Sequence, residues 1–342
     1  MCIRDRLESI AEHGTDALRL ALIQGTGPGQ DLRLYPEKME SCRRFANKIW
    51  NAGRYILLTI PLGTPTAPPE KVHSELAQWL LHGLNDLIRH SQTGLEAHRL
   101  SDVVDSLRSF FWGEFCDWYL EMDKKPERTD EDNQVLAYSY STLLKLMHPY
   151  VPFVTEALWE EFKQPKMLAV SEWPQEQSYS FLESHNRIEL LREAISQIRT
   201  LREKANIGLD KKIGARLDSE KNAELFRTHQ NLIIRLARLS ELEINEKTPD
   251  SSPVNLGAYF NETLASIEAS AVDWKKEIES LQKKLKTESV FVEKSLKKLK
   301  NPGFLDKAPE KVIIELREKV ASTEKTLEAL KLQINELDKL VE

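Results

Sequence analysis

Apolar residues recur every three or four positions along most of this chain, and this spacing predicts a mainly α-helical protein. Four long helices are expected in its first half, over residues 36–60, 72–91, 94–121 and 133–162. The Pro-rich stretch 61–70 ends the first of them, and Pro149 and Pro152 interrupt the last, because proline removes a backbone donor. The first half of the chain is therefore expected to fold as a helical bundle.

The densest apolar run is FFWGEFCDWYLEM, residues 110–122. Read as a regular α-helix that continues the preceding turn, it has one face formed by Leu107, Phe111, Phe115 and Trp118 and an adjoining face formed by Trp112, Cys116 and Tyr119. A helix that is apolar over most of its circumference is buried among other helices, so this run is expected at the centre of the bundle. The carboxylates of Glu114, Asp117 and Glu121 form its polar stripe. An acid–base or metal site is one interpretation of this stripe, but a plain polar edge is favoured.

The region after the bundle changes its pattern. An extended segment is predicted over 167–174 and a helix over 187–205. Two strand-like stretches, 213–217 and 242–245, then flank an amphipathic helix, which predicts a small α/β region followed by a loop over 247–257.

The last 70 residues carry two heptad runs. The first contains Trp274, Ile278, Leu281, Leu285, Val292 and Leu299, with Glu288 and Ser295 as weak points, and the second extends from Leu316 to Val341. A short Asn-Pro-Gly connection between them predicts an antiparallel coiled-coil hairpin. Lysines predominate over glutamates on the first arm, which favours an anionic partner over a merely solvated face.

Composition narrows the classes of protein to which this chain could belong. A chain of 342 residues predicts two or three domains, and its net charge of −6 argues against a uniformly basic nucleic-acid binder while allowing a local basic stripe. Three scattered cysteines without a C-x-x-C pair predict reduced thiols in a cytoplasmic protein, not a disulfide frame or a zinc site. No apolar run is long enough for a membrane span, and no secretory signal is recognised, so no membrane partner is expected.

Two further features have a functional and a plain interpretation. Gly25, Gly27 and Gly29 could form a phosphate loop, but no strand precedes them, and a turn is favoured. His148 beside Pro149 could be a catalytic imidazole, but a packed histidine at a helix end is favoured.

Six segments taken together resemble one family. They are GTDALRLAL (14–22), GQDLRL (29–34), RRFANKIWNAGRY (43–55), FCDWYLE (115–121), LLKLMHPYVPFVTEALWE (143–160) and EWP (172–174). In this order they resemble the C-terminal half of class I aminoacyl-tRNA synthetases of the valine, isoleucine and leucine group. The segment NPGFLDKAPEKVI (301–313) resembles the tail of valyl-tRNA synthetases in particular. The resemblance covers nearly all of residues 7–342 and implies tRNA(Val) as the partner.

The sequence also departs from the family. The HIGH and KMSKS motifs, which hold ATP in these synthetases, are absent, and so are the domains that carry them and the editing domain. The resemblance therefore implies the tRNA-binding part of a ligase that attaches valine with ATP and Mg²⁺. We expect this chain to be inactive alone and to hold no cofactor or metal. Residues 1–6, MCIRDR, differ in character from the rest of the chain and are expected to be a non-native start. Glu37 stands where relatives often have a basic residue, so no contact is assigned to it.

Site residues are implied by the resemblance. Tyr55 matches the position whose ring contacts the anticodon loop, and Leu120 and Glu121 match the pair that lines the anticodon pocket. Lys48 and Arg54 are expected to supply positive charge beside them. The resemblance also implies that the hairpin lies along the outer corner of the tRNA, its elbow. The lysines expected to contact it are chosen by their position near the tip: Lys294 and Lys319, which lie off the heptad seam, with Lys298 and Lys307 closer to the tip. Core packing of Tyr55 and a solvent-facing carboxylate at Glu121 are the alternatives that the residues alone leave open.

Four domains are expected: 1–35, the end of a catalytic domain and stem-contact region; 36–185, an anticodon-binding helical bundle; 186–265, the small α/β region; and 266–342, a coiled-coil tRNA-binding arm. The protein is expected to be monomeric. One alternative is an isoleucyl-type synthetase, although such enzymes typically end in a Cys-bearing zinc region that this sequence lacks. The other is a non-enzymatic helical adaptor whose hairpin binds a protein, for which balanced charge outside the seam would be expected.

Overall fold

The computed structural model describes residues 3–25, 27, 29, 34–247, 256–267, 274–299, 320, 323 and 327. The chain divides into two compact units, Met1–Leu190 and Leu191–Glu342. Helix α9 (Leu182–Lys204) begins in the first unit and ends in the second.

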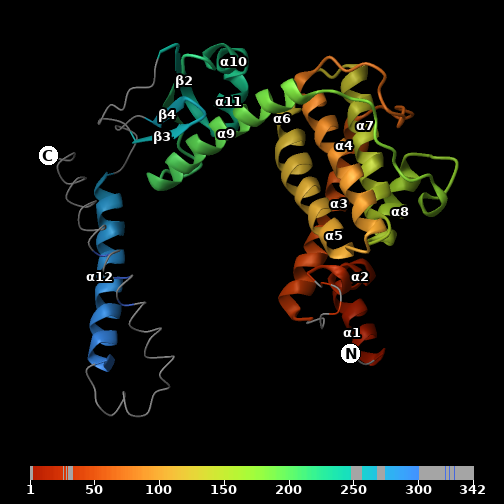
Figure 1. Ribbon diagram of the computed structural model, residues 1–342, viewed down its shortest axis with the longest axis horizontal. Helices are drawn as coiled ribbons and strands as arrows, with labels where there is room; N and C mark the ends of the chain where they lie inside the picture. The colour runs from red at the N-terminus through yellow and green to blue at the C-terminus, as the bar shows by residue number, and fades with distance from the viewer. Residues whose placement is uncertain are drawn as a thin grey trace. The chain divides into compact units, whose positions relative to one another are not determined.

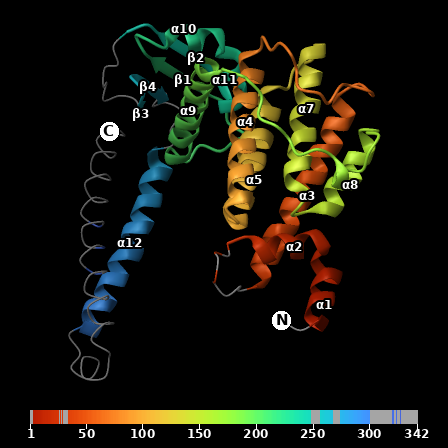
Figure 2. The ribbon, with the colours of Figure 1, turned by 45° about the vertical axis from the view of Figure 1, so that its right-hand side comes forward.

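The first unit is helical throughout. Its elements are α1 (Ile3–His13), α2 (Thr15–Ile23), α3 (Pro36–Thr59), α4 (Glu75–Glu96), α5 (Leu100–Ser109), η1 (Phe110–Tyr119), α6 (Leu120–Met122), α7 (Asp130–Met147), α8 (Pro152–Glu161) and η2 (Leu168–Val170). Helices α3, α4, α5 and α7 lie side by side as a bundle (Figures 1 and 2). Helix α8 packs against α3 and α7, and α2 packs against α3. This confirms the predicted helical bundle, although the third helix begins at Leu100 and the expected extended segment at 167–174 contains the 3₁₀ turn η2.

Local sequence signals set several helix starts. Thr129 and Asp132 form a capping box at α7, with the Thr129 backbone N–H donating to the Asp132 carboxylate at 2.8 Å. Asp16 on α2 caps a helix that is distant in the sequence. Its carboxylate accepts hydrogen bonds from the backbone N–H groups of Phe153 and Val154 at 3.2 and 2.7 Å. These two bonds satisfy donors at the start of α8 and hold α2 against it.

The aromatic run forms a π-helix, η1, and not the regular α-helix that the sequence predicts. A π-helix bonds residue i to i+5, so side chains on one face repeat at a longer spacing than in an α-helix. Phe111, Phe115 and Tyr119 accordingly share the buried face, four residues apart. Trp118, expected among them, is only half-buried. The predicted central position of the run is therefore right, whereas the predicted face is wrong at Trp118.

Aromatic contacts join η1 to α3 and α7. The Phe111 ring of η1 lies 5.8 Å from that of Phe45 on α3, and the Phe115 ring lies 6.1 Å from that of Tyr140 on α7. The buried Tyr140 hydroxyl donates to the carbonyl of Ile49 at 3.0 Å. These contacts fix α3 in the bundle, which matters because α3 carries Lys48, Arg54 and Tyr55 of the predicted anticodon residues.

The second unit contains a four-stranded sheet. Its strands are β1 (Ile213–Asp218), β2 (Leu239–Asn245), β3 (Leu256–Phe260) and β4 (Thr263–Ile267), in the order β2-β1-β4-β3. β1 and β2 are parallel, while β4 is antiparallel to both β1 and β3. The crossover between β1 and β2 contains α10 (Ala223–Thr228) and α11 (Gln230–Ala237), both of which pack on β2. The α/β region is confirmed, but β3 and β4 were not predicted.

The predicted first arm of the hairpin is present as the long helix α12 (Trp274–Leu299). Val292 and Ser295 are buried on it, in agreement with the heptad seam. Of the second arm, Val320 is buried, and residues 301–319 lie outside the described part of the chain.

Candidate nucleic-acid interface

The predicted anticodon residues lie toward one end of the bundle. Phe45 on α3 packs against Trp112 with ring centroids 6.4 Å apart, and Lys48 reaches Asp117 at 3.0 Å. Trp112 and Asp117 are on η1, and the later residue of α3 contacts the later residue of η1, so α3 and η1 run in the same direction. Tyr55 follows Lys48 by seven residues, about 10 Å further along the same face of α3. Tyr55 and Glu121 are thus both expected at the end toward which α3 and η1 run.

Arg54 and Tyr55 face solvent from a helix that is pressed closely against its neighbours. Tyr55 is 37% exposed, whereas Gly53 and Ile56, on either side of Arg54 and Tyr55 in the sequence, are buried. A Cβ added at Gly53 would lie 2.5 Å from both the Leu158 side chain and the Tyr140 hydroxyl. Gly53 thus permits the close approach that holds Arg54 and Tyr55 in place. Among the described residues, the Arg54 side chain has no hydrogen bond or ion pair.

Three other basic residues of α3 are partly neutralised. Lys48 pairs with Asp117 and also lies 5.2 Å from the centroid of the Trp112 ring, a cation–π contact. Arg43 and Arg44 both bind Glu40, and their hydrogen bonds lower the pKa of its carboxyl to about 2. Of the two basic residues expected beside the anticodon residues, Lys48 is therefore in an ion pair, whereas Arg54 is not.

Leu120 and Glu121, the two residues predicted to line the anticodon pocket, differ in exposure. Glu121 is half-exposed and accepts from the Lys124 ammonium at 2.6 Å. Leu120 is buried, with 7% of its surface exposed. Base contacts by Glu121 and Leu120 both stay predictions.

Two exposed leucines near Tyr55 were not predicted as site residues. Leu58 is 84% exposed and Leu62 is 88% exposed. Ile56 and Ile60 nearby are buried, so Leu58 lies off the apolar stripe of α3, and Leu62 lies in the turn after the helix. Apolar residues outside the helical stripe were the signal that could have identified this patch.

Other groups with possible chemistry have structural contacts. Burial raises the pKa of the Cys116 thiol to about 12, and Cys42 is also buried and unpaired with another cysteine. His148 Nδ1 lies 2.9 Å from the Thr155 hydroxyl, and burial lowers the pKa of the imidazole. Within the described residues, no cluster of three or more histidine, cysteine or acidic side chains is arranged to hold a metal. None of the described helices is long and apolar enough to cross a lipid bilayer.

Helix α12 presents lysines to solvent. Lys283, Lys286, Lys294 and Lys297 are exposed, whereas Val292 is buried. Lys298 lies on the same helix. Lys307 and Lys319 lie outside the described residues. The exposed lysines give one side of α12 a positive charge away from the heptad seam.

Two protein families match this chain. Residues 77–217 match the anticodon-binding domain of tRNA ligase, and residues 273–338 match the valyl tRNA synthetase tRNA binding arm. Similar proteins are the valine–tRNA ligases of Carboxydothermus hydrogenoformans (33% identical), Staphylococcus carnosus (33%) and Clostridium acetobutylicum (34%). The matches cover 96–97% of this chain and 39% of each relative. The chain thus spans about two fifths of the length of these relatives.

Proposed function

With an anticodon-binding domain of the tRNA ligase family and a valyl tRNA synthetase tRNA binding arm in one chain, we propose that this protein is the tRNA-binding C-terminal part of a valine–tRNA ligase. Its role is to recognise tRNA(Val) at two places, the anticodon and the elbow. The observation that carries this proposal is the combination of both families with similarity to valine–tRNA ligases along 97% of the chain.

At the anticodon, the proposed interface is the end of the bundle that carries Arg54, Tyr55 and Glu121. Single-stranded bases are recognised by stacking on aromatic rings and by hydrogen bonds to their edges. The exposed Tyr55 ring offers a stacking surface, and Arg54 offers an unneutralised charge for phosphate. The Glu121 carboxylate can accept from an exocyclic amine of a base.

At the elbow, the proposed contacts come from the lysines of the arm. Lys294 is exposed on α12, and Lys298, Lys307 and Lys319 are assigned to the same interface by sequence. Contacts of this kind add affinity and fix the register of the RNA without reading bases.

The catalytic step belongs, in this proposal, to another part of the ligase. Valine, ATP and Mg²⁺ are proposed to bind there, and this chain is proposed to act in the cytoplasm as a monomer. The sequence contains neither HIGH nor KMSKS, so no residue of this chain is assigned a catalytic role. The isoleucyl alternative is disfavoured by the match of residues 273–338 to a valyl-specific arm.

A gel-shift competition tests the proposal. Labelled tRNA(Val) is bound to the 342-residue chain and challenged with unlabelled tRNA(Val), tRNA(Ile) or a polyanionic control RNA. We expect tRNA(Val) to compete best. Equal competition by all three would reduce the protein to a general polyanion binder and would overturn the proposal.

A further inference from the structure

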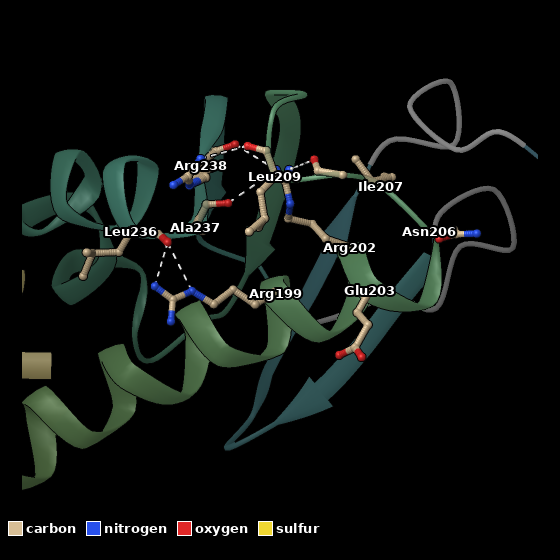
Figure 3. A pocket seen from close by; sticks show the side chains of 10 residues that line it. Arg199, Arg202, Glu203, Asn206, Ile207, Leu209, Leu236, Ala237 and Arg238 are labelled. Atoms are coloured by element: carbon tan, nitrogen blue, oxygen red, sulfur yellow. Dashed lines mark hydrogen bonds between the residues drawn. The ribbon is translucent and has the colours of Figure 1, made fainter. Parts of the chain in front are cut away.

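The second unit contains a cavity of about 670 Å³ between the ends of α9 and α11 (Figure 3). Three arginines line it: Arg199 and Arg202 on α9, and Arg238 directly after α11. We call it the arginine pocket. None of its residues belongs to the anticodon end of the bundle or to α12.

Arg202 forms the floor of the arginine pocket. It is 2% exposed, and its guanidinium donates to backbone carbonyls, including those of Arg238 at 2.8 Å and Lys211 at 2.6 Å. Its buried Nε has no hydrogen-bond partner among the described residues. Burial lowers the pKa of the Arg202 guanidinium, and the nearby charge of Arg238 lowers it further. The site therefore holds a buried positive charge that carbonyl dipoles orient and do not neutralise.

Arg199 and Arg238 form the exposed rim. Arg199 donates twice to the carbonyl of Leu236, at 3.1 and 2.9 Å. Arg238 donates to the carbonyl of Leu209 at 3.1 Å. These bonds hold both guanidinium groups at the mouth of the cavity from opposite elements.

Two acidic residues, Glu203 and Asp210, lie close to this site, and Asp210 raises the pKa of Arg202 by less than burial and Arg238 lower it. Glu203 is on the same wall, but its carboxylate points away from Arg202 (Figure 3). Residues 199–212 and 230–238 together contain seven lysines and arginines against two acidic residues, in a chain whose net charge is −6. Like charges gathered around a cavity are stabilised when an anion binds between them, and guanidinium groups match the geometry of phosphate oxygens.

We propose that the arginine pocket binds a phosphate group. Resting on the proposed function, we assign this group to the sugar–phosphate backbone of the bound tRNA. Such a contact would be a third anchoring point, separate from the anticodon and elbow contacts, and would be independent of base sequence.

The test compares the wild-type chain with the rim variant Arg199→Gln/Arg238→Gln. Arg202 is left in place because its bonds to four carbonyl groups support the fold. The matched control is Arg227→Gln, an exposed arginine of the same unit that pairs with Glu246 at 3.0 Å and does not line the pocket.

In the first experiment, thermal unfolding of each protein is measured in inorganic phosphate and in chloride at the same ionic strength. Phosphate should raise the Tm of the wild-type chain and of Arg227→Gln, because a ligand that binds only the folded state stabilises it, and the rim variant should lose this increase. In the second experiment, tRNA affinity is measured at a series of salt concentrations. The rim variant should lose about 0.7–0.9 in the slope of log affinity against log salt, the share of one phosphate contact.

The outcomes separate the claims. An equal phosphate response in wild type and rim variant would overturn the phosphate site. A lost phosphate response with an unchanged tRNA slope would overturn its assignment to RNA and leave a site for free phosphate. If the wild-type chain bound no tRNA, the proposed function and the RNA assignment would both be wrong. The thermal-unfolding experiment would then decide alone whether the arginine pocket binds phosphate.

Discussion

At the scale of single residues, Tyr55 and Glu121 carry the proposed reading of the anticodon. We expect Tyr55→Ala or Glu121→Ala to weaken binding of the matched anticodon stem-loop by about 1–3 kcal/mol, since a stacking surface or a base-edge acceptor is lost. The loss should be smaller for a stem-loop with a changed anticodon. The measurement is a set of Kd values for both stem-loops.

Lys124→Ala is the matched control for Glu121. It removes the ion pair with Glu121, at 2.6 Å, and keeps the carboxylate. Unchanged preference between the two stem-loops in Tyr55→Ala and Glu121→Ala would make both residues structural.

Gly53 is the residue whose size sets the position of this surface. We expect Gly53→Ala to lower the free energy of unfolding by about 1–3 kcal/mol, because the new methyl would overlap Leu158 and Tyr140. Gly113→Ala is the control, since a Cβ there meets nothing within 4 Å. Chemical denaturation measures both, and an equally small effect of the two substitutions would show that α3 is not closely packed at Gly53.

At the scale of elements, η1 determines which aromatics form the core. Phe115→Ala should lower the free energy of unfolding by about 3–5 kcal/mol, as expected for a fully buried aromatic. Trp118→Ala should lower it clearly less, because Trp118 is only half-buried. Urea unfolding of the two variants decides the point: a larger loss at Trp118 would favour the regular α-helical face over the π-helical one.

The elements predicted correctly are those with a long periodic pattern. The spacing of apolar residues in α3 and α7 identified both helices, and the resemblance brought Tyr55 and Glu121 into the candidate site. The face of η1 was missed because helical wheels assume 3.6 residues per turn, and nothing in FFWGEFCDWY signals a wider turn. The exposure of Leu58 and the ion pair of Lys48 with Asp117 depend on tertiary contacts, which the spacing of apolar residues does not reveal.

The β3–β4 hairpin shows a second limit. Its two strands have five residues each, and its turn residues Asn261 and Glu262 have φ values of +38° and +57°. Turns of this kind usually contain Asn-Gly, so a glutamate in the second position removed the usual signal. The four domain boundaries and the elbow lysines stay predictions.

At the scale of the whole molecule, the arm should contribute to affinity through charge alone. We expect Lys294→Glu/Lys319→Glu to reduce the slope of log affinity against log salt for whole tRNA by about two contacts, near 0.7–0.9 each. An anticodon stem-loop, which lacks the elbow, should show the same slope with both proteins. A wild-type slope on whole tRNA would indicate a structural or dimerising hairpin.

The absence of the ATP motifs gives a second expectation at this scale. The 342-residue chain should show no valine-dependent ATP–pyrophosphate exchange, because the sequence lacks HIGH and KMSKS, the motifs that hold ATP in the synthetases it resembles. The measurement requires a mass-verified sample. Exchange above background that depends on valine would contradict it.

The central claim is that one chain holds tRNA(Val) at two distant places, so the most direct measurement compares intact tRNA(Val) with its isolated anticodon stem-loop. Kd values for both are determined by fluorescence anisotropy with the wild-type chain at one salt concentration. Linked contacts should make intact tRNA(Val) bind at least about tenfold more tightly than the stem-loop, because the second contact forms at a high effective concentration. A changed anticodon should weaken the binding of both RNAs. Equal Kd values for intact tRNA and stem-loop would contradict the account.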